Sequence, residues 1–312
     1  MKREYGNFFV LIFALVSAIA VFSAPNSDGD WTMRKSDEAG KVEFSLMQSH
    51  KNHHSQNSST WPLTAFAGLD ATTAARHDVL FTVKRDAGTF DCEGFLRDGE
   101  GAGIFHFTAN PGYAQEMDKL GFRGIDADKQ YEMAVLDVSV DFAREMAGEH
   151  LRGLDTDKLI EFRIFGVDTK FIHDMRALGL PADTSSRLVE FKIHGVSPEM
   201  VRELKQLGYS PDEEKLIEMR IHGATPEFLQ AMAREGYEHL DLERVIEFRI
   251  HGVSPEFVEK LKTLGYVHPA PEKLVEMRIH GVTPEYITSM QAKGLKDLSI
   301  DKLVEMRIHG ID

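Results

Sequence analysis

The most regular feature of the chain is a pattern of apolar and polar residues that recurs every 29 residues. Leu274–Gly281 reads Leu-Val-Glu-Met-Arg-Ile-His-Gly, and Leu303–Gly310 repeats it letter for letter. The glycines that close this motif lie 29 residues apart with one interval of 28, at Gly166, Gly195, Gly223, Gly252, Gly281 and Gly310. The same spacing, carried backwards, reaches Asp137 and Thr108. The sequence therefore predicts seven repeats over residues 108–312.

Each repeat carries the signals of two helices. The first begins at a triplet such as Ser254–Glu256, in which the hydroxyl is an N-cap, proline takes the first helical position and glutamate faces the positive end of the dipole. It ends at a glycine such as Gly265. The second helix covers the motif that ends in His-Gly. On a helical wheel its apolar arc holds Leu274, Val275, Met277 and Ile279.

A leucine-rich repeat is the alternative for the second segment. Val275, Met277 and Ile279 alternate with polar residues, as in a strand, and leucine-rich repeats have a similar period. The segment begins with helix-cap chemistry, however, and Val282 stands where the leucine-rich consensus has asparagine or cysteine. The pattern therefore favours paired helices that bury their apolar faces only on their neighbours.

A two-residue period precedes the repeats. Three apolar runs between Val79 and Phe107, separated by Gly- and Asp-containing turns, predict a small antiparallel meander within residues 61–107. The expected fold class is mainly α: an α-solenoid of seven two-helix repeats over residues 108–312, preceded by a small three-stranded antiparallel β unit.

The first sixty residues are predicted to lie outside the folded part. Lys2 and Arg3 precede an apolar run over Phe8–Phe22, which is short for a membrane span and typical of a signal peptide over residues 1–23. Residues 24–60 contain few large apolar side chains, so we expect a disordered linker. The linker histidines could bind a metal, but no second cluster completes a coordination shell, and a polar tether is favoured; they are His50, His53 and His54. The chain is thus expected to be exported, periplasmic or secreted, and to contact a membrane only if the signal segment is retained.

Charge and cysteine content narrow the function classes. The formal net charge is −14, which disfavours nucleic acid as a partner. The single cysteine, Cys92, excludes an intramolecular disulfide framework and a multi-cysteine zinc site. Acidic neighbours disfavour its thiolate, so we expect a packed residue rather than a nucleophile. We predict no cofactor and no metal.

Two rows of polar residues recur at fixed positions of the second helix. The cation row points into the apolar arc, where it needs a partner, and the glutamates after proline (Glu199, Glu227, Glu256 and Glu285) are candidates; a ligand-binding row is the alternative. It consists of Arg163, Lys192, Arg220, Arg249, Arg278 and Arg307. The histidine row lies in the last helical turn, where it favours the negative end of the dipole; a pH-sensing stack is the alternative. It consists of His194, His222, His251, His280 and His309.

The last repeat keeps the apolar pattern of the internal ones. Leu303, Val304, Met306 and Ile308 match their counterparts, although solenoids normally end in an atypical cap. We therefore predict that this repeat self-associates or docks on a partner chain.

The amino-acid sequence of the repeats resembles that of a known protein family. Arg278–Tyr286 reads Arg-Ile-His-Gly-Val-Thr-Pro-Glu-Tyr, and Lys84–Phe90 and Gly101–Phe105 precede the repeats. Residues 61–312 resemble the short C-terminal extracytoplasmic repeats of bacterial beta-lactam-sensor-type membrane metallopeptidases. The resemblance implies an exported bacterial module. The chain lacks the His-Glu-x-x-His motif of the peptidase part, so no catalytic residue is carried over.

These observations favour a non-enzymatic, exported repeat protein that binds a protein or peptide, as a scaffold or a sensor-regulatory module of the bacterial cell envelope. The alternative is an enzyme or small-molecule receptor with a site where the β unit meets the first repeats, using Asp86, Glu93 and His106. A deep enclosed pocket at that junction would favour the alternative.

Overall fold

The computed structural model describes residues 26–50 and 53–311, which form two compact units. The sheet unit extends to Thr169 and includes Asp183–Ser185, whereas the helical unit comprises Lys170–Ala182 and the chain from Ser186 onward. The predicted signal peptide lies outside the described residues.

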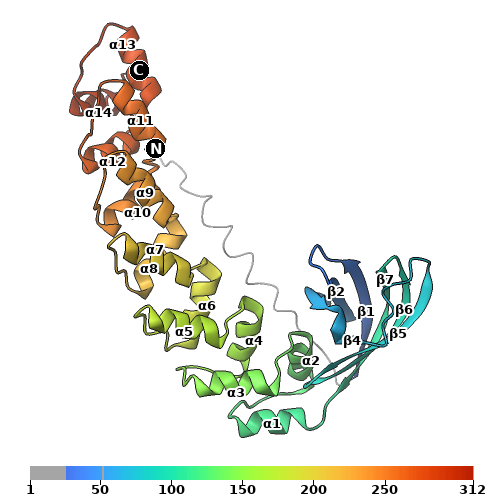
Figure 1. Cartoon of the computed structure of the whole chain (residues 1–312). Helices are drawn as coiled ribbons and strands as arrows, with labels where there is room; N and C mark the ends of the chain where they lie inside the picture. Colours follow the sequence, from blue (N-terminus) through green and yellow to red (C-terminus); the bar gives the residue numbers. More distant parts are fainter. Residues whose placement is uncertain (1–25, 51–52, 312) are drawn as a thin grey trace. The chain divides into compact units, whose positions relative to one another are not determined.

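The seven strands of the described residues belong to one curved antiparallel sheet (Figure 1). Its order is β3-β2-β1-β7-β6-β5-β4, and a short 3-10 helix, Leu63–Ala65, precedes β4. The strands are β1 (Asn26–Lys35), β2 (Lys41–His50), β3 (His53–Pro62), β4 (Phe66–Ala67), β5 (His77–Arg85), β6 (Gly88–Arg97) and β7 (Glu100–Ala109).

The predicted fold class is therefore wrong in its β part. The three runs expected between Val79 and Phe107 are β5, β6 and β7, but four more strands complete the sheet. Strands β1, β2 and most of β3 occupy residues 26–60, where a disordered linker was predicted. Their inward positions carry Trp31, Phe44 and Trp61 but also Gln48, Asn57 and Ser59, so polar residues on both faces conceal the alternation.

Aromatic side chains fill the concave side of the sheet. Trp31 is fully buried, with its ring centroid 5.1 Å from that of Phe81. Its indole lies beside Gly94 and Gly103, where a Cβ would come within 2.8 Å and 2.7 Å of the ring. The Nε1–H of Trp31 donates to the carbonyl oxygen of Glu93 at 3.1 Å. Paired glycines on β6 and β7 thus make room for the central tryptophan.

The first repeats are built onto this sheet. In the sheet unit, α1 is Tyr113–Lys119, α2 is Ala127–Val135, α3 is Val140–Gly148 and α4 is Thr156–Phe165. Helix α2 packs on β6 and β7, and Gln130 donates to the carbonyls of Ala87 and Asn110 at 2.7 and 2.6 Å. Asp137, with a left-handed φ of 55° where later repeats have glycine, forms ion pairs with Arg85 (3.2 Å) and Arg163 (3.3 Å).

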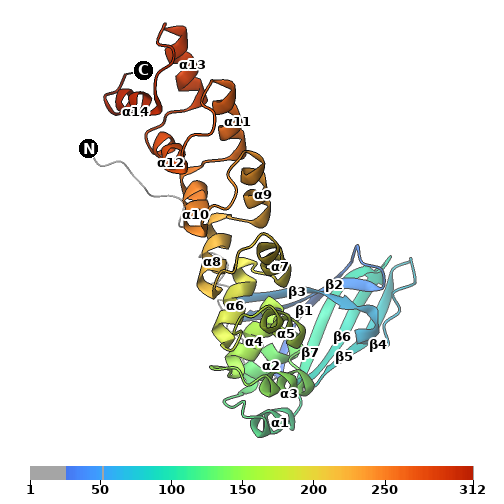
Figure 2. The ribbon, with the colours of Figure 1, turned by 60° about the vertical axis from the view of Figure 1, so that its left-hand side comes forward.

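The remaining helices lie in two rows within the helical unit (Figures 1 and 2). Helices α8, α10, α12 and α14 contact one another in series, whereas α7 contacts α9 and α11 contacts α13. They are α5 (Thr169–Ala177, which starts at the boundary), α6 (Ser185–His194), α7 (Pro198–Gln206), α8 (Glu213–His222), α9 (Pro226–Arg234), α10 (Leu242–His251), α11 (Pro255–Thr263), α12 (Pro271–Ile279), α13 (Pro284–Ala292) and α14 (Ile300–Ile308).

The caps lie where the sequence signals put them. Ser254 accepts a hydrogen bond from the backbone N–H of Phe257 at 3.2 Å, and the helix that begins there has proline in its first turn. The second helix α10 is capped by Asp241 and ends at the left-handed Gly252, as α8 is capped by Asp212 and ends at Gly223, whereas α14 is capped by Ser299. Val275, Met277 and Ile279 lie in α12, so the leucine-rich-repeat alternative is wrong.

Candidate functional site

The cation row joins consecutive repeats. Within the helical unit, the Nε–H groups of Arg220, Arg249 and Arg278 donate to the last-turn carbonyls of His194, His222 and His251. The donor–acceptor distances are 3.0, 3.4 and 3.2 Å. A guanidinium at the negative end of a helix satisfies carbonyls that have no intrahelical donor. Each of these arginines thus caps the second helix of the preceding repeat.

An aromatic ring holds the other side of most of these cations. Arg249, Arg278 and Arg307 lie 4.9, 5.2 and 4.7 Å from the ring centroids of Phe228, Phe257 and Tyr286. Lys192 lies over Phe171 at 4.1 Å, and Arg163 of the sheet unit lies over Phe142 at 5.1 Å. Backbone carbonyls and aromatic rings therefore contact the cation row. Of the predicted glutamates, Glu227 is also influenced by the row, because Arg220 contributes to lowering its pKa.

The glutamates after proline contact the N-termini of their own helices, and Glu285 also pairs with Lys260 of the preceding repeat at 3.5 Å. The pKa of Glu256 is lowered, first by its own backbone N–H and then by the Ser254 hydroxyl. The pKa of Glu199 is lowered by its own backbone N–H and then by Arg202, which lies 3.2 Å away. These carboxylates complete helix N-termini.

The histidine row contributes through its backbone. The carbonyls of His194, His222 and His251 accept the arginine bonds, while their side chains are half-buried. His280 is half-buried and His309 is exposed. Among the described residues, no group of three or more His, Cys, Asp or Glu could hold a metal ion.

Sequence reasoning missed a row of exposed isoleucines. At the position before each histidine, the side chains are 43–59% exposed, although each belongs to an otherwise buried apolar pattern. The isoleucine row of the helical unit consists of Ile193, Ile221, Ile250, Ile279 and Ile308; Ile164 has the same repeat position in the sheet unit. The helical wheel contains the signal. Leu274, Val275 and Met277 span an arc whose centre lies between Leu274 and Arg278, and Ile279 lies about 120° from that centre.

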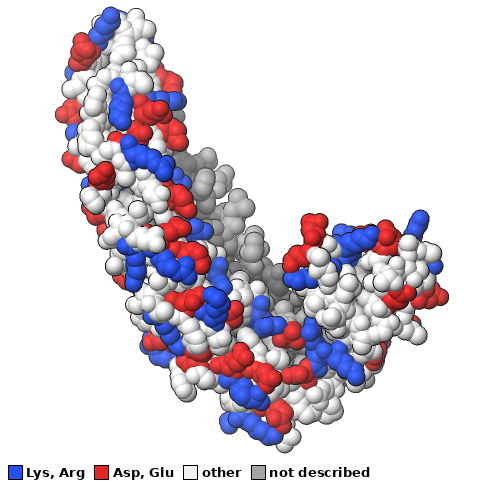
Figure 3. Space-filling model, viewed as in Figure 1, with Lys and Arg blue, Asp and Glu red and all other residues white. Residues whose placement is uncertain are grey.

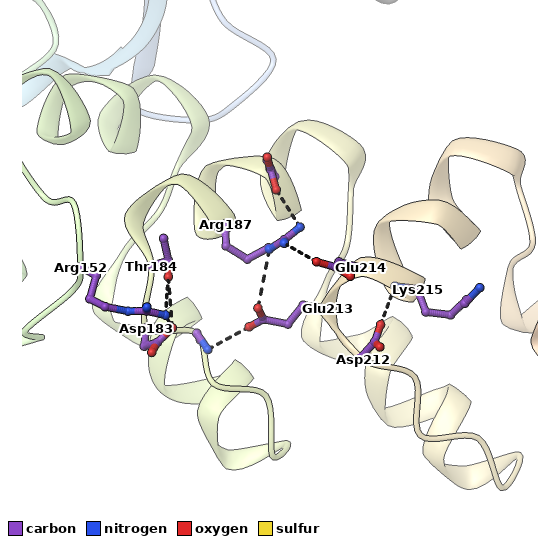
Figure 4. A network of polar contacts seen from close by, with 10 residues as sticks. Arg152, Asp183, Thr184, Arg187, Asp212, Glu213, Glu214 and Lys215 are labelled. Carbon is purple, nitrogen blue, oxygen red and sulfur yellow. Dashed lines mark hydrogen bonds and ion pairs between the residues drawn. The ribbon is translucent and has the colours of Figure 1, made fainter.

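Paired charges flank the isoleucine row. Three residues before each isoleucine stands a glutamate, and each forms an ion pair of 2.5–2.9 Å with a Lys or Arg one turn earlier. The glutamates are Glu190, Glu218, Glu247, Glu276 and Glu305. Some of these cations also reach the next repeat: Arg187 contacts Glu213 and Glu214, as Figure 4 shows. Blue and red side chains alternate along the helices in Figure 3.

The structure brings together two of the three residues of the predicted junction site. Asp86, in the turn between β5 and β6, accepts the backbone N–H of Val140 at 2.9 Å, next to the N-cap of α3. Glu93 and His106 line one open hollow on the outward side of the sheet. Glu93 lies five residues along β6 from Gly88, roughly 17 Å from the turn that holds Asp86. The three side chains therefore do not share a site.

The predicted packing role of Cys92 agrees with its surroundings. The side chain is buried on β6, and burial raises the pKa of its thiol to about 12, with Asp91 adding to the shift. The thiol is therefore protonated at neutral pH and is a poor nucleophile.

The last repeat is mostly packed. Leu303, Val304 and Met306 are buried, and of the four side chains on which predicted self-association rests, Ile308 alone is exposed. Self-association stays a prediction.

None of the described helices has the length and apolar character needed to cross a membrane. Comparison of the chain with protein-family models and with curated proteins gave no match. The proposals below therefore rest on the residues and their geometry.

Proposed function

We propose that the chain is a non-catalytic binding protein that holds an extended protein segment along the isoleucine row. The observation that carries the proposal is the repetition of one exposed, branched apolar side chain in five successive repeats. A single exposed isoleucine is ordinary, but a contiguous apolar surface on a soluble protein marks an interaction site. The arginine, tyrosine and ion-pair contacts between repeats do not use these side chains.

The spacing of the row suggests the form of the bound segment. Packed helices lie about 8–10 Å apart, so isoleucines of consecutive repeats recur at about that interval. A polyproline II segment has three residues per turn and rises about 3.1 Å per residue, so it presents every third side chain on one side about 9.3 Å apart. A β-strand places side chains i and i+3 on opposite faces, so it cannot match this spacing on one side.

The width of the row argues against a bound helix. An amphipathic helix presents an apolar stripe at least 100° wide, with contributions from positions i, i+3 and i+4. The isoleucine row is one side chain wide and is bordered by the paired glutamates. We therefore infer a segment with an apolar residue at every third position and small or polar residues between them.

Two labelled peptides of about thirteen residues test this function. One carries leucine at every third position among prolines and glutamines, and the other has the same composition with its leucines clustered. We expect the first to bind the full chain about tenfold more tightly in fluorescence anisotropy. The triple variant Ile221→Ser, Ile250→Ser, Ile279→Ser should lose about tenfold in affinity.

A matched variant controls for the loss of exposed apolar surface. Val267 and Leu295 are 72% and 42% exposed and lie outside the row. The variant Val267→Ser, Leu295→Ser should bind the first peptide as the wild type does. Equal binding of the two peptides, or unchanged binding by a triple variant with a native circular dichroism spectrum, would refute the proposal.

Export is part of the same proposal. It is supported by the basic and then apolar N-terminal sequence, with the expected cleavage before Ala24. N-terminal sequencing of the protein from an expressing bacterium should give Ala24 as the first residue. A cytoplasmic product that retains Met1 would contradict it.

A further inference from the structure

The outward side of the sheet carries a second apolar surface, unrelated to the repeats. Cross-strand pairing places Leu80, Glu93, Ile104 and Asp30 in one row across β5, β6, β7 and β1. The row on one side holds Thr82, Asp91, His106 and Asp28, and the row on the other holds Asp78, Phe95, Ala102 and Thr32. We call these twelve positions the outer sheet face.

Two aliphatic side chains stand out on this face. Leu80 is 73% exposed and Ile104 is 53% exposed. They lie two strands apart, about 10 Å, with Glu93 between them. Both residues, with Glu93 and Asp30, line two adjoining open hollows. The face is therefore indented around its apolar side chains, on strands that are paired on both sides.

The charge of the face has one sign. Its twelve positions include five carboxylates and neither Lys nor Arg; the acids are Asp28, Asp30, Asp78, Asp91 and Glu93. His106 contacts Asp28 at 2.6 Å, and Asp91 accepts the Thr82 hydroxyl at 2.9 Å. Cations begin at the rim: the next outward positions of the same strands carry Lys84 on β5 and Arg97 on β6, and Arg76 lies 4.0 Å from the ring centroid of Phe95. In contrast, the glutamates beside the isoleucine row each have a cation.

We propose that the outer sheet face docks a cationic protein segment. Such a segment would place apolar side chains against Leu80 and Ile104 and Lys or Arg against the five carboxylates. Charge complementarity selects this occupant, because an acidic or neutral partner would leave the carboxylates desolvated without compensation. A second copy of the chain is disfavoured for the same reason, since it would bring five more carboxylates to the interface.

The test uses a short labelled peptide of alternating leucine and lysine, with a serine–lysine peptide of equal charge as its partner. We expect the leucine–lysine peptide to bind the full chain at least about tenfold more tightly than the serine–lysine peptide. Its affinity should fall with added salt, because part of the attraction is between exposed charges. Equal binding of the two peptides would overturn the apolar part of the proposal.

Two face variants separate the apolar and charged contributions. Leu80→Ser with Ile104→Ser, and Asp30→Asn with Glu93→Gln, should each weaken binding of the leucine–lysine peptide about tenfold. Glu145→Gln with Glu259→Gln removes the same number of exposed carboxylates elsewhere and should change it less than about twofold. The isoleucine-row triple variant should bind it normally, which separates this surface from the proposed function. If Glu145→Gln with Glu259→Gln weakens binding as much as the charge variant, the attraction is to net charge and the docking surface is refuted.

Discussion

The sheet and the helical repeats achieve order by different means. Trp31 of the sheet donates to the carbonyl of Glu93, 62 residues away, and packs on the rings of Phe44 and Phe81. Within the described strands, these contacts do not recur at a fixed spacing. A repeat instead contacts residues 27 or 32 positions away through arginine and tyrosine side chains, and these contacts recur. The sheet therefore depends on individual residues, whereas the repeats distribute their stability over many similar contacts.

The two regions also expose apolar residues differently. The sheet presents Leu80 and Ile104 among five carboxylates, with neither Lys nor Arg at the twelve positions of the outer sheet face. The helical unit presents a line of isoleucines beside ion pairs that neutralise one another. Exposed apolar side chains thus lie among negative charges on the outer sheet face and among neutralised ion pairs on the repeats. We therefore expect the two surfaces to bind different partners.

The largest expected effect comes from the centre of the sheet. Trp31→Ala removes a fully buried indole, and we expect the sheet unit to lose about 3–5 kcal/mol of stability. Helices α8–α12 should be unaffected, because they belong to the other compact unit. Hydrogen exchange resolved by mass spectrometry should show faster exchange in the strands of the sheet and unchanged exchange in α8–α12.

A repeat substitution of comparable volume is the control. Phe248→Ala removes a fully buried ring of α10 and should accelerate exchange around that helix without affecting the sheet. Uniformly faster exchange over the whole chain in either variant would mean that the two units unfold together, and the contrast between them would fail.

Buried tyrosines make both regions sensitive to alkali. Burial raises the pKa of Tyr237 to about 12, and it raises the pKa of Tyr113 and Tyr131 in the sheet unit as well. A phenol whose pKa is higher in the folded state contributes stability below pH 10, and this contribution is lost as the pH rises towards 12. The loss is at most about 1.4 kcal/mol per pH unit for each such group.

Tyr237→Phe isolates the contribution of one repeat. The Tyr237 hydroxyl donates to the carbonyl of Pro269 at 2.7 Å, so the variant should be less stable at neutral pH by about 1 kcal/mol. Its stability should fall less steeply above pH 10 than that of the wild type. Urea unfolding at several pH values measures both quantities, and parallel pH profiles would contradict the assignment.

Arg278→Met tests the cap between repeats. The variant removes the bond to the His251 carbonyl and the cation over Phe257, while it keeps much of the apolar stem. At this half-exposed site we expect a loss of about 1 kcal/mol in urea unfolding. Arg278→Lys keeps the charge without the guanidinium geometry, so its stability should lie between those of the wild type and of Arg278→Met. If Arg278→Met is as stable as the wild type, the arginine cap does not contribute to stability.

The helices could be predicted because their signals are local. A Ser/Thr-Pro-Glu triplet and a closing glycine specify both ends of a helix within a dozen residues, and Ser254 and Gly252 take these roles in the structure. The sequence also predicted that the cation row points into the apolar arc and needs partners. Those partners are a carbonyl of the preceding repeat and a ring on the first helix of the same repeat, and a wheel of one helix does not contain them.

The sheet and the binding surfaces were harder to predict for physical reasons. Strand β3 carries Ser, Thr and Asn on both faces, and its pairing with β2 stabilises it through backbone bonds that composition does not report. The exposure of Ile279 depends on its distance from the centre of the buried arc, since its identity alone indicated burial. Leu80 and Ile104 become neighbours only through the register of β5, β6 and β7.

The smallest expected effect lies in the ion pairs beside the isoleucine row. Lys215 contacts Glu218 at 2.6 Å and Glu243 of the next repeat at 3.1 Å. Because these groups are close to solvent, Lys215→Gln should reduce stability by only a few tenths of a kcal/mol, and about 0.5 M NaCl should abolish the difference. Thermal unfolding with and without salt measures it, and Lys296→Gln in the connection before α14 is the matched control. A loss above about 1 kcal/mol that persists in salt would mean that these ion pairs hold the repeats together. The charges beside the isoleucine row would then be explained by folding alone. Their contrast with the carboxylates of the outer sheet face would no longer indicate that the two surfaces bind different partners.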